Sequence, residues 1–128
     1  EGVQLAPFYD LLSVASYDSP AFDKVAWPAA TQLAWPILDV RRFSEITRNL
    51  MLEAGAVLNL AKGTAERLLS HLQGRIVQEA EALYTEVDAE NAQISHVRPA
   101  LSATLAGEAR CLRTIQHTVI KEMVNRLK

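Results

Sequence analysis

The sequence predicts a mainly α-helical fold, in which an irregular N-terminal third with a short strand precedes a three-helix antiparallel bundle. Four of the five prolines lie in the first 41 residues. Proline disrupts helices because it lacks a backbone donor and moves the preceding residue out of helical geometry. The other 87 residues contain one proline, Pro99, and are rich in Leu, Ala, Glu and Arg. We therefore expect an irregular segment over 1–41 and a helical bundle over 42–128.

Three short elements are expected in the first third. Alternating apolar residues predict a strand over 2–6, which Pro7 would end. A short helix is expected to start at Ser19-Pro20 and to run through Lys24. One further helical turn is expected over Thr31–Trp35, just before Pro36.

The second part has the apolar spacing of amphipathic helices. Apolar residues at three- and four-residue steps predict a helix over 43–59 and a second one of about 25 residues after Thr64, whose hydroxyl can cap it. The polar stretch 88–95 is expected to be a loop, and Pro99 suits the first turn of a last helix. Short connections predict antiparallel neighbours that pack along one apolar seam.

Leu72 is expected to lie on this seam. It falls near the middle of the second helix, at the spacing of the other apolar residues. If it is buried there, Leu72→Ala should lower the free energy of unfolding by about 2–5 kcal/mol.

Composition and charge are typical of one folded domain. The chain has 128 residues, 49% of them hydrophobic, and its net charge of −2 gives no general attraction for nucleic acid. The single cysteine, Cys111, excludes an internal disulfide and is typical of a reducing compartment. No apolar run has the length of a membrane span, and the N-terminus lacks the pattern of a signal peptide. We therefore expect a cytoplasmic protein without membrane contacts.

Metal-binding and nucleophilic residue types do not form a recognisable site. His71, His96 and His117 have no His or Cys three or four residues away, the spacing that puts two ligands on one helix face. Cys111 and His117 are six residues apart and would diverge on a helix. We expect structural or solvated histidines and a cysteine that behaves as a small apolar residue.

Asp10 is the acidic residue with the most unusual surroundings. It follows the expected strand and lies within the apolar cluster Phe8, Tyr9, Leu11 and Leu12. A carboxylate among such neighbours is costly unless something pairs with it. Most acids after a turn cap or hydrogen-bond locally, but kinase-like folds also place a metal-binding Asp just past a strand, beside the nucleotide.

The chain resembles a known family at these positions. Residues 3–13, Val-Gln-Leu-Ala-Pro-Phe-Tyr-Asp-Leu-Leu-Ser, resemble the L-[AT]-P-x-Y-D-[IL]-[IL]-S motif of HipA-type serine/threonine kinases, the toxins of bacterial toxin–antitoxin pairs. Residues 32–34, Gln-Leu-Ala, resemble the family's Lys-Leu-Ala segment, with Gln for the usual Lys. Residues 36–39 replace a glycine-containing turn, and 42–48 resemble a helix-opening stretch. Of these segments, Pro-x-Tyr-Asp is the specific one.

This resemblance implies a C-terminal lobe of a kinase-like fold, with a metal-site and activation-type segment over 1–41. In the family, the Asp of the motif coordinates Mg²⁺ and the Tyr before it lies at the nucleotide. The expected metal ligand is therefore Asp10, and the expected ATP-site residues are Tyr9 and Asp10. The resemblance also implies a protein substrate, an antitoxin partner, and contact with DNA only through that antitoxin.

The activity expected of this chain alone depends on functional residues that precede the motif in the family. The family's phosphate loop, nucleotide-pairing Lys, catalytic Asp and second metal-binding Asn all come before the motif, whereas this sequence starts only nine residues before Asp10. Phosphoryl transfer depends on several positioned charges and metal ions, so we expect a C-terminal kinase fragment that is inactive alone. The alternative is a non-catalytic helical interaction module in which Asp10 is a structural acid.

Overall fold

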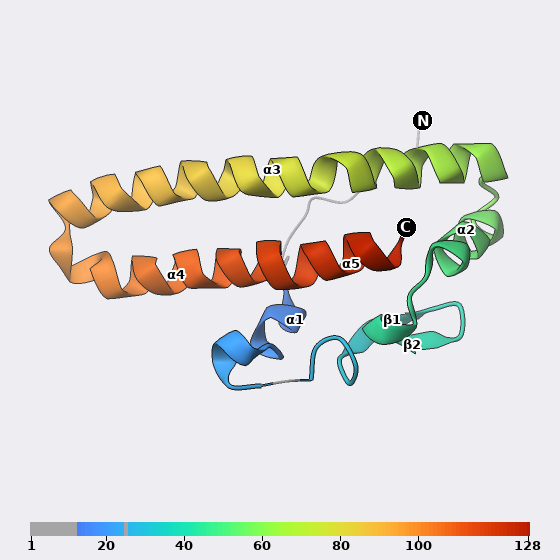
Figure 1. Ribbon diagram of the computed structural model, residues 1–128, viewed down its shortest axis with the longest axis horizontal. Helices are drawn as coiled ribbons and strands as arrows, with labels where there is room; N and C mark the ends of the chain where they lie inside the picture. Colours follow the sequence, from blue (N-terminus) through green and yellow to red (C-terminus); the bar gives the residue numbers. More distant parts are fainter. Residues whose placement is uncertain (1–12, 25) are drawn as a thin grey trace, which may run out of the picture.

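Two long helical segments run antiparallel along the length of the molecule, which is mainly helical as expected (Figure 1). The computed structural model describes residues 13–24 and 26–128. The first long segment is α3 (Lys62–Val97), and a 3₁₀ turn over Pro99–Leu101 reverses the chain. The second segment comprises α4 (Ser102–Thr114), a π-helical stretch η4 (Ile115–Ile120) and α5 (Lys121–Arg126). These two segments are called the helical hairpin below.

Helix α3 is longer than expected, with 36 residues. The expected loop over 88–95 is wrong, because the helix continues through it. No Gly or Pro occurs between Gly74 and Pro99, so nothing interrupts the backbone, and the polar residues form an exposed helix surface. The helix ends at Val97, two residues before Pro99, since proline disfavours helical geometry in the residue before it. The expected cap at Thr64 is also wrong, because the helix begins earlier, at Lys62.

Side-chain hydrogen bonds join the two arms of the hairpin. The Arg113 Nε and Nη2 groups donate to the Tyr84 hydroxyl at 2.8 and 2.6 Å, and the guanidinium lies 5.4 Å from the centre of the tyrosine ring. The hydrogen bond to Tyr84 raises the pKa of Arg113, whose guanidinium is in any case positively charged at every ordinary pH. Farther from the turn at Pro99–Leu101, Gln73 Nε2 of α3 donates to the Val124 carbonyl of α5 at 3.4 Å.

Helix α2 (Arg48–Val57) is shorter than the helix expected over 43–59. Residues Phe43–Glu45 form a separate 3₁₀ turn, and the Thr47 hydroxyl then caps α2 by accepting from the Leu50 amide at 3.2 Å. A Cβ built on Gly55 would lie 3.2 Å from the Ala65 Cβ, so α2 approaches the first turns of α3 closely. Because α2 reaches only this end of α3, the expected three-helix bundle is instead a two-helix hairpin with a short helix at one end (Figure 1).

The described part of the first third contains short elements only, as expected. They are α1 (Val14–Tyr17), a 3₁₀ turn at Pro20–Phe22, and the strands β1 (Gln32–Ile37) and β2 (Val40–Arg42). The 3₁₀ turn confirms a short helix after Ser19-Pro20, although it ends before Lys24.

The helical turn expected over Thr31–Trp35 is wrong, because β1 occupies most of it. The two strands pair antiparallel, with Gln32 opposite Arg42 and Ile37 opposite Val40. Pro36 is compatible with β1 because a two-stranded sheet consists of edge strands. The strand expected over 2–6 lies outside the described residues.

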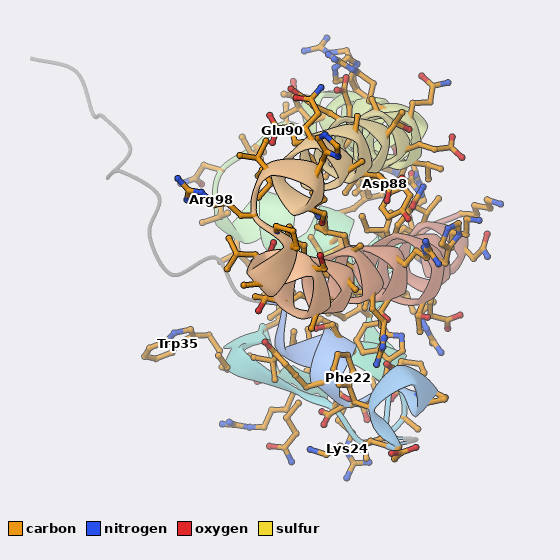
Figure 2. All side chains as sticks on the ribbon, turned by 90° about the vertical axis from the view of Figure 1, so that its left-hand side faces the viewer. Phe22, Lys24, Trp35, Asp88, Glu90 and Arg98 are labelled. Atoms are coloured by element: carbon orange, nitrogen blue, oxygen red, sulfur yellow. The ribbon has the colours of Figure 1, made fainter. Side chains whose placement is uncertain are left out.

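The molecule has three layers, with α4–α5 between α3 on one side and the first third on the other (Figure 2). The first third packs on the middle layer through contacts between α1 and η4. Helix α3 is covered by α4–α5 on one side and by α2 at its beginning. Leu72 is accordingly 55% exposed, so its expected burial on a seam is wrong. Among the described residues, no helix is long and apolar enough to cross a lipid bilayer.

Candidate functional site

The residues expected to bind metal and nucleotide, Tyr9 and Asp10, lie outside the described part of the chain. The description begins at Ser13, which is the N-terminal flanking residue of α1. Of the segment that carries the motif, residues 3–13, the structure therefore describes only the last residue, Ser13, and its surroundings.

Helix α1 is fixed against the middle layer by small side chains. Ala15 and Ser16 are buried, and α1 contacts η4. The Ser16 hydroxyl donates to the Ser13 carbonyl at 2.7 Å and lies 3.8 Å from the Cys111 sulfur. Cys111 is half-buried here, next to α1, which is consistent with a packing role.

Asp18 organises the loop that follows α1. Its carboxylate accepts a hydrogen bond from the Thr31 hydroxyl at 3.1 Å and lies 3.9 Å from the Lys24 ammonium. Its backbone carbonyl accepts from the Trp27 amide at 2.8 Å. Sequence reasoning concentrated on Asp10 and missed Asp18, whose position directly before Ser19-Pro20 is the only sequence signal of a turn-forming acid. Its contacts assign it a structural role.

A hollow of about 520 Å³ lies beside Ser13, where α1, the first strand and η4 meet. Its lining includes Ser13 and Val14 from α1, Gln32 and Leu33 from β1, and Val119 from η4. The two segments that resemble the kinase family, one ending at Ser13 and the other beginning at Gln32, therefore meet at one place. The lining residues that the structure describes are neutral, and the amide of Gln32 stands where the family pattern has a lysine.

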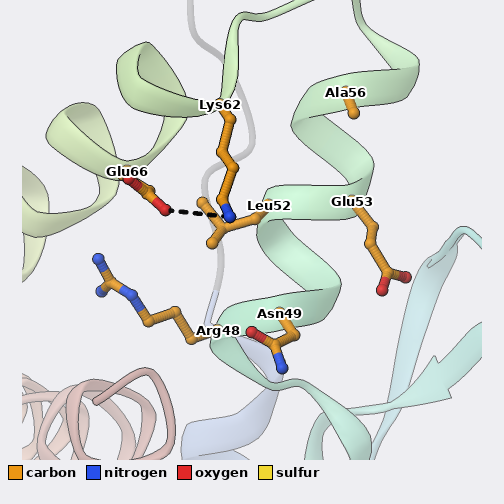
Figure 3. A pocket seen from close by; sticks show the side chains of 7 residues that line it. All are labelled: Arg48, Asn49, Leu52, Glu53, Ala56, Lys62 and Glu66. Carbon is orange, nitrogen blue, oxygen red and sulfur yellow. Dashed lines mark ion pairs between the residues drawn. The ribbon is translucent and has the colours of Figure 1, made fainter.

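A second hollow, of about 460 Å³, separates α2 from the beginning of α3 (Figure 3). It is lined by two cations, Arg48 and Lys62, and two acids, Glu53 and Glu66. The Lys62 ammonium lies 3.9 Å from a Glu66 carboxylate oxygen, as the dashed line in Figure 3 marks. With balanced charges on its walls, this hollow does not attract an anion such as a phosphate.

Arg48 is held by neutral groups on two other helices. It donates to Gln73 Oε1 at 2.7 Å and to the Ser70 hydroxyl at 2.8 Å, both on α3, and to the Leu127 carbonyl at 3.3 Å. This set of bonds, called the Arg48 clamp below, ties α2 to α3 and to the end of α5. The clamp makes Arg48 a structural residue of the second hollow and leaves it poorly placed to bind a ligand.

The histidines are solvated, as expected. His71, His96 and His117 are all exposed, and His117 Nδ1 lies 2.9 Å from the Lys121 ammonium one turn along the helix. Among residues 13–24 and 26–128, no three His, Cys, Asp or Glu side chains gather closely enough to hold a metal ion.

Comparisons of the chain with protein-family models, with curated proteins and with solved structures gave no match.

Proposed function

We propose that this chain is the C-terminal helical part of a HipA-like serine/threonine kinase and is catalytically inactive alone. In the intact enzyme, Asp10 would bind Mg²⁺ at the nucleotide and Tyr9 would lie beside the ATP. The observation that carries the proposal is the hollow beside Ser13, where the segment after Pro-x-Tyr-Asp and the Gln-Leu-Ala segment come together. These segments are separated in sequence, and their meeting at one hollow is what a shared local structure would require.

The hairpin turn after β1 gives further support. Leu38 has a φ of 53°, a left-handed conformation that glycine adopts most easily. Residues 36–39 stand where the family has a glycine-containing turn, so the backbone here has the geometry that such a turn requires.

The donor chemistry of Asp10 suits a hard cation. Carboxylate oxygens are preferred ligands of Mg²⁺, which is usually held by one or two carboxylates together with substrate phosphates and water. Asp10 is the ligand that the resemblance assigns to this chain. The bound Mg²⁺ would neutralise phosphate charge in the intact enzyme.

The proposal is tested in two steps. The reading frame that encodes this chain should continue upstream into a kinase catalytic loop with its Asp and Asn. In the enzyme encoded by that frame, Asp10→Asn should reduce phosphate transfer from ATP at least about 100-fold, because Asn keeps the shape of Asp but not the charge that holds Mg²⁺. Asp39→Asn, on the exposed hairpin turn, is the matched control and should leave transfer unchanged.

The stability of the 128-residue chain separates metal binding from a structural role of Asp10. If Asp10 faces an unfinished metal site, Asp10→Asn should leave the free energy of unfolding of the isolated chain nearly unchanged. If Asp10 fixes a turn, the same change should cost about 1–3 kcal/mol. A destabilised chain together with a fully active enzyme would refute the assignment of Asp10 as a metal ligand.

A helical interaction module without kinase ancestry is the second candidate. It is favoured by the many exposed apolar side chains on the helices, which a module of this kind would cover with a partner. An upstream sequence without kinase motifs would favour this candidate, whereas a catalytic loop in that sequence would support the first.

A further inference from the structure

The two halves of the second hairpin arm differ in how far they are buried. The buried residues of this arm are Leu105 and Thr114 in α4 and Gln116 in η4. None of the six residues of α5, Lys121–Arg126, is buried. Helix α2 is similar, because Gly55 is its one buried residue. Segments with few buried side chains open locally at a low cost in free energy, so we expect α2 and α5 to open more easily than α4.

The π-helical stretch η4 forms a joint between α4 and α5. Such stretches are rare within α-helices and interrupt their regular hydrogen bonding. Because η4 contacts both α1 and α3, this stretch is fixed in the middle layer of the molecule. Within the described part of the chain, the buried Gln116 Oε1 atom has no hydrogen-bond partner, and a buried group of this kind is destabilising. The joint is therefore anchored but weak, and α5 can separate from α4 at this point.

The side-chain amide of Gln73 links three helices. Its Oε1 atom accepts a hydrogen bond from Arg48 of α2 at 2.7 Å, and its Nε2 atom donates to the Val124 carbonyl of α5 at 3.4 Å. Arg48 also donates to the carbonyl of Leu127, directly after α5, at 3.3 Å. If α5 moves away, Gln73 and Arg48 each lose one of these partners. The start of α2 is thus bonded to α5 both directly and through α3.

Arg126 of α5 adds a second link, to the segment that leads into α2. Its Nη1 group donates to the Ser44 carbonyl at 2.8 Å, and its Nε group pairs with Glu122 one helical turn earlier at 2.7 Å. Ser44 belongs to the 3₁₀ turn that is followed by the Thr47 cap of α2. The pair with Glu122 holds the guanidinium in place on α5, so Arg126 fixes the approach to α2 as long as α5 is folded.

We propose that α5 acts as a latch for α2, so that the two helices open together about η4 while α4 stays folded. They are joined by the bonds of Arg48 and Arg126, so the opening of either helix removes bonds that hold the other. Shared bonds of this kind make the opening cooperative. The opening separates α2 from α3, which form the two walls of the second hollow, and it releases Arg48 from the Leu127 carbonyl. The inference does not depend on the kinase assignment.

Native-state hydrogen exchange of the 128-residue chain tests the latch, under conditions in which exchange reports the opening equilibrium. A substitution changes an opening only if the structure around it is lost in that opening. Lys121 is exposed on α5 and bonds to His117 of its own arm, so Lys121→Gly destabilises α5 without removing a bond to α2. Exchange in α2 and in α5 should both become about threefold faster. Unchanged exchange in α2 would show that α2 opens without α5, which would overturn the proposal.

Arg110→Gly is the matched control in α4. Arg110 is exposed, and glycine disfavours a helix at this position to a similar extent. Because α4 stays folded when the latch opens, α2 and α5 should exchange at their original rates while α4 exchanges about threefold faster. Faster exchange in α2 or α5 would mean that the whole arm opens as one body, contrary to the proposal.

Glu53→Gly tests the same coupling from the side of α2. Glu53 is exposed, and the substitution destabilises α2. Coupling between two elements is reciprocal, so exchange in α5 should become about threefold faster as well. Unchanged exchange in α5 would show that α5 opens by itself and would refute a shared opening.

Removing the links tests whether these particular bonds couple the two helices. Arg48→Met and Arg126→Met together delete the bonds to the Leu127 and Ser44 carbonyls and keep most of both aliphatic stems. In this background, Lys121→Gly should still make exchange in α5 about threefold faster but should no longer change exchange in α2. An effect on α2 that persists at threefold would mean that other contacts couple the helices, and it would overturn the assignment of these bonds as the latch.

Discussion

The first third and the helical hairpin differ in how completely they bury their side chains. Of the five buried apolar residues of the described chain, Ala15 and Trp27 lie in the first third and Ile46 lies just before α2, whereas the longer hairpin contributes Ala65 and Leu105. The first third also buries hydroxyl groups that bond to its own backbone, such as Ser19, which donates to the Ser16 carbonyl at 2.9 Å. The irregular part of the chain is therefore the better packed.

This difference shows that helical periodicity and burial are separate properties. Helix α3 has an apolar face wider than one neighbouring helix can cover, so the residues on the flank of the face stay exposed. In the first third, prolines prevent long helices, and the short elements fold back on one another and enclose the side chains between them. Amphipathic spacing thus identifies the side chains that can be buried. Which of them are buried depends on the elements that pack against the helix.

The largest expected effect lies in the first third. Trp27 is 8% exposed and packs against Phe43 with 4.9 Å between ring centres, so Trp27→Ala should lower the free energy of unfolding by about 3–5 kcal/mol. Trp35 is 84% exposed and points away from the body of the molecule (Figure 2), so Trp35→Ala should change it by less than about 0.5 kcal/mol. Urea denaturation followed by circular dichroism measures both, and similar losses would contradict the packing described for the first third.

The sequence predicted the mainly helical class and most helix positions, and its errors at 88–95 and at 32–42 have different origins. Residues 88–95 were expected to be a loop because they are polar, although they contain no Gly or Pro to end a helix. Residues 32–42 were not expected to be a hairpin, because Pro36 and the absence of a typical turn pair such as Asn-Gly concealed it. At 88–95, polarity was taken as a sign of a loop, whereas the absence of Gly and Pro correctly indicates that the helix continues.

The candidate site could be predicted only as far as its sequence motif. The segment around Asp10 stands outside the described residues, so its expected role stays a prediction. Asp18 could not be predicted, because its importance depends on Thr31 and Trp27 reaching it from later in the chain, and that depends on the fold of the whole loop. Contacts of this kind between distant residues leave no periodic pattern in a sequence.

A second prediction compares two leucines within the hairpin. Leu105 is buried where α4 faces α3, so Leu105→Ala should cost about 2–4 kcal/mol. Leu72→Ala should cost less than about 1 kcal/mol, because Leu72 is half exposed, contrary to the 2–5 kcal/mol expected from its spacing alone. Denaturation of both variants measures the two losses. Equal losses would show that the hairpin is packed as tightly as the first third.

A third prediction concerns the Arg48 clamp. Arg48→Met keeps most of the aliphatic stem but removes the three hydrogen bonds to Gln73, Ser70 and the Leu127 carbonyl, and it should cost about 1–3 kcal/mol. Arg41→Met, on the exposed face of β2, is the control and should be nearly neutral. Hydrogen exchange should show faster opening of α2 in Arg48→Met while α4 stays protected. Unchanged exchange in α2 would mean that packing around Gly55, and not the clamp, holds this helix.

The smallest expected effect lies at the turn of the β-hairpin and is a gain of stability. Leu38 and Asp39 connect β1 to β2, and two-residue hairpin loops favour glycine where φ is positive. At a φ of 53°, Leu38 pays a steric cost from its Cβ that glycine avoids, whereas glycine adds backbone entropy to the unfolded chain. The steric term is the larger of the two, so Leu38→Gly should raise the free energy of unfolding by about 0.5–1 kcal/mol.

Asp39→Gly is the control, because φ is not positive at this neighbouring position. It relieves no steric cost and should lower the free energy of unfolding. Thermal denaturation of the two variants distinguishes these signs. A loss in both would mean that the leucine side chain stabilises the turn more than its backbone conformation costs, and the likeness to a glycine-containing turn would lose its physical basis.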